Sequence, residues 1–399
     1  MYKLLSSIFY SNNDKYEEIY LNRYSSESTY RFDFRINKNN AFLLINHQIL
    51  QLIERIMELN CELSLKMNKL PEIALNQYAK KCLVDEVRMT NEIEGVHSTR
   101  KEINDILKDK LGSKKGTRLY GLVKKYELLT KEDINFDKCE DIRNLYDKLV
   151  LQEILDDDSE NEPDGKIFRK EKVYVQNPSG KIIHTGIYPE EKITTDMSKA
   201  LDILNNDDYN FMIRIAIFHY IFGYIHPFYD GNGRVSRFIS SYLLSKKLQY
   251  LVSYRLSYTI KQNINSYYKS FKQTNDDKNK GDLTMFVIKF FDVLVKSLED
   301  LCESLDEKYN KLNYFSKIGE KLCKEDNKKY KLVFILIQNT LFGDSGISVD
   351  ELHEISKIGE SKIRMSLKEL EECNLLYITK DGRKKLYDIN LNNLSESNN

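Results

Sequence analysis

The stretch HPFYDGNGRVSR, residues 226–237, decides the fold at the centre of this 399-residue chain. It follows the mostly apolar run FMIRIAIFHYIFGYI (211–225) and leads into the helical pattern VSRFISSYLLSKKL. Pro227 ends the first helix, and the glycines that follow let the backbone turn sharply. The stretch therefore predicts two helices joined by a tight turn that carries a histidine, an aspartate and two arginines.

Two simpler interpretations of this stretch were weighed. Asp-Gly and Asn-Gly are turn dipeptides, but a plain turn explains neither the histidine nor two arginines at helical spacing. A calcium loop would need Asp or Asn at position 234 and Glu at position 241, where the chain has Arg234 and Ser241. The calcium loop is excluded, and a functional site remains.

The glycines and arginines together indicate a site for a polyphosphate. Gly231 and Gly233 allow positive φ angles, so that backbone amides can turn toward an anion. The helix that begins near Arg234 adds its free N–H groups and the positive end of its dipole. Arg234 and Arg237 are three residues apart and share a helix face, and guanidinium groups suit phosphate oxygens.

The aspartate and the histidine supply the remaining chemistry. Asp230 offers a hard oxygen ligand for Mg²⁺, a cation that bridges phosphates and takes few protein ligands. His226, four residues earlier, is placed to take a proton from an attacking hydroxyl, a role that contributes about 10² to 10⁴ in rate. Phe228 is expected to point into the core and fix the turn.

The twelve residues resemble the signature of the Fic family, H-P-F-x-[D/E]-G-N-G-R-x-x-R, at every fixed position. This resemblance implies a protein adenylyltransferase, which transfers AMP from Mg-ATP to a Ser, Thr or Tyr hydroxyl of a protein. It implies the following roles: His226 as base, Asp230 as metal ligand, Asn232 with Gly231 and Gly233 as cradle of the inner phosphates, Arg234 on the outer phosphates and Arg237 on the γ-phosphate.

Two further segments resemble the family. VYVQNPSGKIIHTGIY (173–188) has the composition of a β-hairpin and is similar to the family's flap, which holds a target protein by strand addition. NINSYYKSF is similar to a segment N-R-x-x-Y-Y, with Asn263 and Tyr267 in place and Ile264 where arginine is usual. The resemblance implies adenine contacts for Asn263 and Tyr267, although core packing explains the tyrosines equally well.

A built-in inhibitor is implied by TNEIEG. Thr90 and Glu94 are four residues apart and share one face of a helix that ends at Gly95. The pattern resembles the inhibitory helix [S/T]-x-x-x-E-[G/N], whose glutamate pairs with the second arginine of the signature, here Arg237. Glu94 would then compete with the γ-phosphate. In some members the same glutamate positions a water that removes AMP, so both directions stay open.

Composition limits the class of protein. Lys plus Arg and Asp plus Glu both total 61, so no net charge attracts nucleic acid or membrane. The six cysteines show no CxxC spacing, which favours reduced thiols in a cytoplasmic protein. Neither a signal peptide nor an apolar run of about 20 residues is evident. Scarce glycine (16) and proline (5) predict long helices and a mainly α fold.

The remaining segments complete the predicted organisation. Residues 1–40 read as a short strand or an irregular arm, and helices are predicted from Ala41 to about Lys66, from Pro71 to Gly95 and from Arg100. The expected parts are an N-terminal region with the inhibitory helix (1–100), a Fic-type helical core with a small hairpin flap (101–300), and a linker helix with a winged-helix domain (301–399).

The last seventy residues carry the rival hypothesis. Three helices and a hairpin at Asp381-Gly382 are in winged-helix order, which suggests a DNA-binding regulator with an inactive nucleotide pocket. Lys362, Arg364 and Lys368 are interspersed with glutamates, so protein–protein contact or self-association is favoured over DNA. Within the enzyme class, transfer of UMP, phosphate or phosphocholine, modification of the chain itself and a homo-oligomer stay open.

Overall fold

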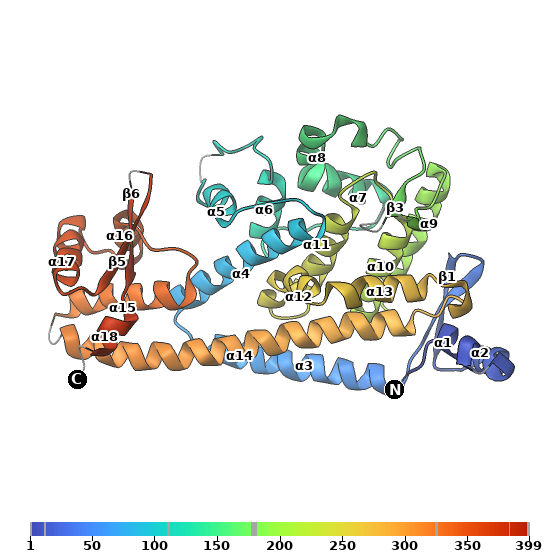
Figure 1. The fold of residues 1–399 in the computed structure, drawn as a ribbon, viewed down its shortest axis with the longest axis horizontal. Coiled ribbons are helices and arrows are strands. Elements are labelled where there is room, and N and C mark those ends of the chain that lie inside the picture. The colour runs from blue at the N-terminus through green and yellow to red at the C-terminus, as the bar shows by residue number, and fades with distance from the viewer. Residues whose placement is uncertain are drawn as a thin grey trace. The chain divides into compact units, whose positions relative to one another are not determined.

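The computed structural model describes residues 2–11, 13–109, 112–176, 182–323, 326–382 and 384–396. Helices make up most of these residues, and the strands form three two-stranded antiparallel sheets (Figure 1). The predicted mainly α fold with a small hairpin is confirmed. The chain divides into two compact units, Met1–Asn60 with Val84–Leu298 and Cys61–Leu83 with Glu299–Asn399. The division predicted from the sequence, at residues 100 and 300, follows expected function and stays a prediction.

The helices and strands of the chain have the following bounds. The N-terminal part holds α1 (Leu5–Ser11), α2 (Tyr16–Ser25), β1 (Thr29–Ile36), β2 (Asn39–Leu44), α3 (His47–Met67), α4 (Glu72–Ile93), α5 (Arg100–Lys108) and α6 (Tyr120–Glu127). The central part holds α7 (Cys139–Tyr146), α8 (Gln152–Asp157), β3 (Tyr174–Gln176), β4 (Ile182–Thr185), α9 (Glu190–Asn205), α10 (Phe211–Ile225) and α11 (Asn232–Ser245). Then come α12 (Leu256–Gln262), α13 (Ile264–Thr274) and α14 (Thr284–Cys323).

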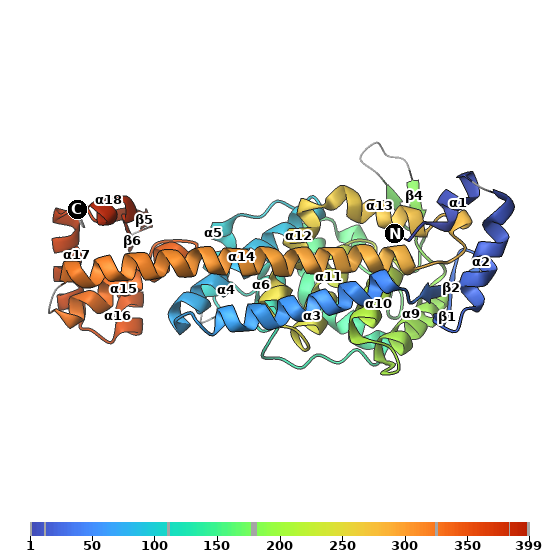
Figure 2. The same cartoon turned by 90° about the horizontal axis from the view of Figure 1, so that it is seen from below.

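The short strand predicted within residues 1–40 is present as β1, but two helices precede it. Leu5–Ser11 and Tyr16–Ser25 form α1 and α2, which lie beside the β1–β2 hairpin in both views (Figures 1 and 2). The helix predicted from Ala41 begins at His47, because residues 41–44 pair with β1, with Tyr30 opposite Leu43. Ala41, Phe42 and Leu43 are all buried, and a short continuous apolar run does not distinguish a buried strand from a helix.

The core of the first unit is built on α10. Twelve of its 15 residues are buried, which explains why the run is apolar on all sides. It packs against α9 and α11. Its 15 residues are fewer than the roughly 20 that a helix needs to cross a bilayer. Among the described residues no helix is both long and apolar enough to cross a membrane.

The turn after α10 is anchored by aromatic stacking. Phe228 is fully buried, as predicted, and its ring stacks on Tyr146 with centroids 3.7 Å apart and planes at 14°. Tyr146 ends α7, and the π-helical residues Asp147–Leu151 continue this segment into α8. The segment from α7 to α8 therefore supports the turn that carries the signature residues.

The second unit shows the predicted order of elements. It contains α15 (Asn327–Phe342), α16 (Val349–Ser356), α17 (Glu360–Glu372), β5 (Leu376–Asp381), β6 (Lys384–Ile389) and α18 (Leu391–Glu396). Ser348 caps α16 and forms a capping box with Glu351, as predicted. The hairpin turns at Gly382, whose φ of +59° suits glycine. Its interpretation as a winged helix stays a prediction.

Candidate active site

His226 sits at the junction between α10 and the turn. It is the C-cap of α10, with φ of +54°, and its backbone N–H donates to the Phe222 carbonyl at 2.9 Å. Its Nδ1 lies 3.4 Å from the Gly223 carbonyl, which favours a proton on Nδ1 and leaves Nε2 as the basic atom. Burial lowers the pKa of His226 to about 4, so the ring is neutral at pH 7. A neutral imidazole with a free Nε2 can accept a proton.

The turn itself is held by Asn232. Its side-chain Nδ2 donates to the Phe228 carbonyl at 2.8 Å, and its Oδ1 accepts from the Phe228 N–H at 2.9 Å. Gly231, with φ of +78°, is the N-cap of α11, so the helix begins at the end of this turn. The Asn232 amide is thus engaged with the backbone of the turn.

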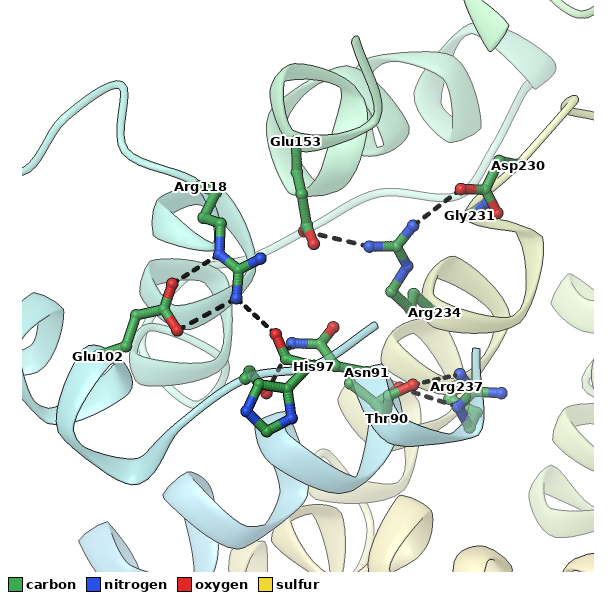
Figure 3. A network of polar contacts seen from close by, with 11 residues as sticks. Thr90, Asn91, His97, Glu102, Arg118, Glu153, Asp230, Gly231, Arg234 and Arg237 are labelled. Carbon is green, nitrogen blue, oxygen red and sulfur yellow. Dashed lines mark hydrogen bonds and ion pairs between the residues drawn. The ribbon is translucent and has the colours of Figure 1, made fainter. Parts of the chain in front are cut away.

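Glu94 and Thr90 both contact Arg237. The buried guanidinium donates from Nε to Thr90 Oγ1 and from Nη2 to the Thr90 carbonyl, both at 2.9 Å (Figure 3). Nη2 also donates to Glu94 Oε1 at 2.8 Å. The structure therefore brings together the three residues that the sequence placed in one inhibitory contact.

Gly233 makes room for this contact. A Cβ at Gly233 would overlap the Glu94 carboxylate and lie 2.8 Å from Arg237 Nη1. The carboxylate of Glu94 consequently sits against the first turn of α11, where the helix dipole and free N–H groups favour an anion. Glu94 occupies the place that the sequence assigned to a phosphate.

Arg234 and Asp230 form a second charged group on the same helix start. Arg234 Nη2 lies 3.3 Å from Asp230 Oδ2, and Nη1 lies 3.1 Å from Glu153 Oε2 (Figure 3). Asp230 Oδ1 accepts from the Gly231 N–H at 2.6 Å, and the Asp230 side chain is partly exposed. The described part of the chain holds no group of three or more His, Cys, Asp or Glu side chains that could bind a metal ion.

A cavity lies between the flap and the part of the site around His226 and Arg237, and Asp230 and Arg234 are not among the residues that line it. Glu94, His226, Gly233 and Arg237 line it, together with Val175 and His184 of the flap strands and Tyr267 and Tyr268 of α13. Its volume is about 180 Å³, below the ~300–1,000 Å³ typical of small-molecule sites. The Glu94 carboxylate fills the part next to Arg237.

The two predicted adenine contacts share the pocket between α13 and α14, and Tyr267 also lines the cavity beside His226. The Tyr267 hydroxyl lies 2.8 Å from His219 Nε2. Asn263 does not line that cavity. It lies just before α13 with its side-chain amide bonded to the Thr259 carbonyl. The turn of the flap, residues 177–181, lies outside the described residues.

Three buried polar residues belong to the site although no motif marks them. Arg169 donates to the carbonyls of His226 (2.9 Å), Ile187 (2.8 Å) and Glu171 (2.5 Å), and so fixes the histidine and both ends of the flap. His219 connects Tyr267 to the Ser240 hydroxyl, and burial lowers its pKa to about 3. Glu153 holds Arg234. Of these three residues, Arg169 alone had a sequence signal, because it follows two apolar residues in GKIFRKEKV.

The basic residues of the second unit are engaged with carboxylates. The ion pairs are Lys362–Asp326 (3.2 Å), Arg364–Glu360 (3.0 Å), Lys368–Glu372 (3.8 Å) and Lys384–Asp350 (3.2 Å). A surface that binds DNA needs cations that can replace the counterions of phosphates. Carboxylates therefore offset the charge of these four basic side chains.

Comparison with known proteins agrees with this geometry. Residues 136–244 match the model of the Fic/DOC family. A Fic family protein from Desulfovibrio desulfuricans has a similar fold, with a TM-score of 0.53 at 17% identity, over 86% of this chain and 96% of that one. Proteins of the Fic/DOC family generally transfer nucleotide-derived groups onto proteins.

Two further solved structures resemble the chain more distantly. Fic-1 from C. elegans aligns at 19% identity and a TM-score of 0.44, over 64% of this chain and 72% of that one. A Fic domain containing signaling protein from Bacteroides thetaiotaomicron aligns at 18% identity and a TM-score of 0.42, over 65% and 97%.

Proposed function

We propose that this protein is an adenylyltransferase that moves AMP from Mg-ATP to a Ser, Thr or Tyr hydroxyl of a protein. One observation carries the proposal: a neutral histidine, the start of α11 and Arg237 all line one cavity below the flap. This is the set that in-line transfer at an α-phosphorus needs, namely a base, an anion cradle and a cation for the outer phosphates.

The reaction assigns each bond and proton to a group of this chain or its substrates. The target hydroxyl oxygen bonds to the α-phosphorus while the bond to the oxygen that bridges toward the β-phosphate breaks. Pyrophosphate leaves, and the hydroxyl proton passes to His226 Nε2. Because Gly223 favours the proton on Nδ1, Nε2 is the atom available for this step.

The residues present fit a magnesium ion held jointly with phosphates. Asp230 is a partly exposed carboxylate beside the cradle, and its Oδ2 has only the 3.3 Å contact with Arg234. When bound, Mg²⁺ would neutralise phosphate charge. Arg234 and Arg237 are left to orient the outer phosphates, and the first N–H groups of α11 face the inner ones.

Autoinhibition by Glu94 is the second part of the proposal. Its carboxylate is bonded to Arg237 at 2.8 Å and lies where a side chain on Gly233 would sit. A γ-phosphate directed to Arg237 would have to displace it, and two anions cannot share this guanidinium without strong repulsion. Release of Glu94 is therefore expected to switch the enzyme on.

The flap is the proposed docking place for the target. Tyr174, Ile182 and Ile183 on β3 and β4 are each about half exposed, although β-sheet apolar residues usually face a partner. Val175 and His184, which pair across the hairpin, both line the cavity. A target strand added to this hairpin would bring its hydroxyl toward His226. A second copy of the chain, or the chain itself, could supply that strand.

The test is transfer from labelled ATP. Wild type, Glu94→Gly and His226→Ala are incubated with Mg²⁺ and ATP labelled at the α- or the γ-phosphate, with and without cell lysate. The proposal predicts that only α-label reaches protein, that Glu94→Gly labels most, and that His226→Ala labels nothing. A labelled band at 47.1 kDa would show self-modification. Transfer of γ-label, or of UMP in preference to AMP, would contradict the assignment.

The same experiment separates addition from removal of AMP. Protein labelled by Glu94→Gly is freed of nucleotide and then exposed to wild type. Loss of label would show that Glu94 serves in the removal reaction, whereas stable label supports a purely inhibitory glutamate.

A further inference from the structure

Arg234 is held between two carboxylates from different parts of the chain. Its side chain is 1% exposed, with Asp230 Oδ2 3.3 Å from Nη2 and Glu153 Oε2 3.1 Å from Nη1 (Figure 3). Asp230 lies one helical turn before Arg234, whereas Glu153 comes from α8. The two partners therefore restrain the guanidinium from two sides.

Asp230 is the more exposed of the two partners and accepts a hydrogen bond from Nη2, whereas the contact with Glu153 is an ion pair without hydrogen-bond geometry. The Asp230 side chain is 43% exposed, and its other oxygen already accepts from the Gly231 N–H. In the proposed reaction this carboxylate also serves Mg²⁺, which demands close oxygen ligands and competes with a guanidinium. Glu153 is then the remaining anion that fixes Arg234 while nucleotide is bound.

Glu153 is itself fixed by packing and charge. Its side chain is 10% exposed, and the next residue, Ile154, packs where a Cβ on Gly231 would lie 2.8 Å from Cδ1. Burial raises the pKa of Glu153, and the charges of Arg234 and Arg118 oppose that shift. Figure 3 shows its carboxylate between these two guanidinium groups.

We propose that Glu153 is a positioning residue that holds Arg234 toward the β-phosphate of the nucleotide. The same segment that packs against the phosphate turn at Gly231 carries the carboxylate that orients the arginine, so turn and arginine move as one body. The inference rests on the proposed function, since it assigns Arg234 to an outer phosphate.

The direction of the effect distinguishes positioning from simple charge balance. If Glu153 only neutralised Arg234, its replacement by glutamine would make the site more positive and would tighten phosphate binding. If Glu153 positions Arg234, the same change weakens binding of ligands with a β-phosphate and leaves AMP unaffected. A general loss of folding would weaken both.

The experiment measures nucleotide affinity in the Glu94→Gly background, in which Arg237 is accessible. Dissociation constants of Mg-ADP and AMP are determined by calorimetry for that parent, for Glu153→Gln, and for Glu160→Gln, an exposed carboxylate on the same segment. We expect Glu153→Gln to raise the constant for ADP about tenfold, the size of one lost charge-assisted contact, with AMP and the Glu160→Gln control unchanged. The KM for ATP should rise by the same factor.

Each outcome bears on one claim. Unchanged or tighter ADP binding in Glu153→Gln overturns the positioning role and leaves the proposed function standing. If the Glu94→Gly parent binds ADP but transfers no AMP, the proposed function is refuted, and the binding constants still test the role of Glu153. If the parent binds neither ADP nor AMP, both the proposed function and the role of Glu153 are overturned. If Glu153→Gln does not fold, Glu153→Asp, which retracts the carboxylate by one methylene, must weaken ADP selectively or the inference fails.

Discussion

The two arginines of α11 make a natural comparison, because they are three residues apart, almost fully buried, and each paired with a glutamate from elsewhere. Arg237 pairs with Glu94 at 2.8 Å, and Arg234 pairs with Glu153 at 3.1 Å. The glutamates differ in their setting. Glu94 follows the last residue of α4 and lies in the cavity, with a side chain 22% exposed, whereas Glu153 lies behind the turn and is 10% exposed.

The difference shows how an arginine–glutamate pair can either inhibit ligand binding or support it. In the proposed reaction, the Glu94 carboxylate competes with a ligand anion and must leave for turnover. In the same proposal, the Glu153 carboxylate orients Arg234 toward the ligand and stays in place. Whether a buried glutamate inhibits or supports an arginine thus depends on which side of the guanidinium it takes, and the net stability of the pair matters less.

The largest expected effect on AMP transfer comes from breaking the Glu94–Arg237 pair. Glu94→Gly frees Arg237 and the space at Gly233, so we expect AMP transfer to rise about hundredfold, the scale of breaking a partly buried ion pair. Glu92→Gly is the matched control, because Glu92 lies on the same last turn but is exposed. Initial rates with α-labelled ATP decide the matter, and equal rates for wild type and Glu94→Gly would refute the inhibitory role.

The pH profile of Glu94→Gly reports on the chemical step without inhibition by Glu94. Burial lowers the pKa of His226 to about 4, so its basic form persists as pH falls, and protonation removes it only near pH 4. An ordinary histidine, with a pKa near 6.5, would lose about tenfold in rate between pH 7.5 and 5.5. We expect almost no loss of kcat/KM over that interval, with circular dichroism as the check on folding. A midpoint near pH 6.5 would show that the base is another group or that the ring is solvated.

A smaller effect is expected from the residue that holds the end of the inhibitory helix. Arg118 binds both oxygens of Glu102 and donates to the carbonyl of His97, three residues after Glu94 (Figure 3). Arg118→Ala should loosen this loop and raise transfer by a few-fold, as exposed pairs contribute little. The increase should vanish in the Glu94→Gly background. An equal increase in both backgrounds would mean that Arg118 acts on the site by another route.

The smallest effect is expected from an arginine–glutamate pair on the surface. Arg364 and Glu360 of α17 lie 3.0 Å apart with side chains 61% and 49% exposed. Arg364→Ala should lower the free energy of unfolding by less than about 0.5 kcal/mol, as is usual for exposed pairs one turn apart. Urea denaturation measures this change, and a loss of several times that size would give α17 a structural role that its exposure does not suggest.

The sequence predicted those parts of the site that lie within one short segment. His226, Asp230 and both arginines follow one another in twelve residues, and their chemistry is readable from spacing alone. Thr90 and Glu94 were found because the resemblance to an inhibitory helix named them, and the structure brings them onto Arg237. Thr99 and Ser348 cap α5 and α16, and such caps depend only on neighbouring residues.

What the sequence could not predict depends on tertiary contact. Glu153 lies 81 residues before Arg234 in a segment rich in acidic residues, where nothing distinguishes it from exposed neighbours such as Glu160. The buried strand β2 carries the same apolar residues as a helix start, and only its pairing with β1 settles the difference. Asn263 matched a motif by sequence, and the motif does not indicate that its side chain donates to the Thr259 carbonyl.

The central claim is that the Glu94 carboxylate and a nucleotide phosphate use the same place at the start of α11. A crystal structure of Glu94→Gly with Mg²⁺ and a non-hydrolysable ATP analogue tests this directly. The account predicts a phosphate oxygen within hydrogen-bonding distance of Arg237 and of the first N–H groups of α11, with the α-phosphorus facing His226. A nucleotide bound elsewhere, or phosphates that leave Arg237 without contact, would contradict it.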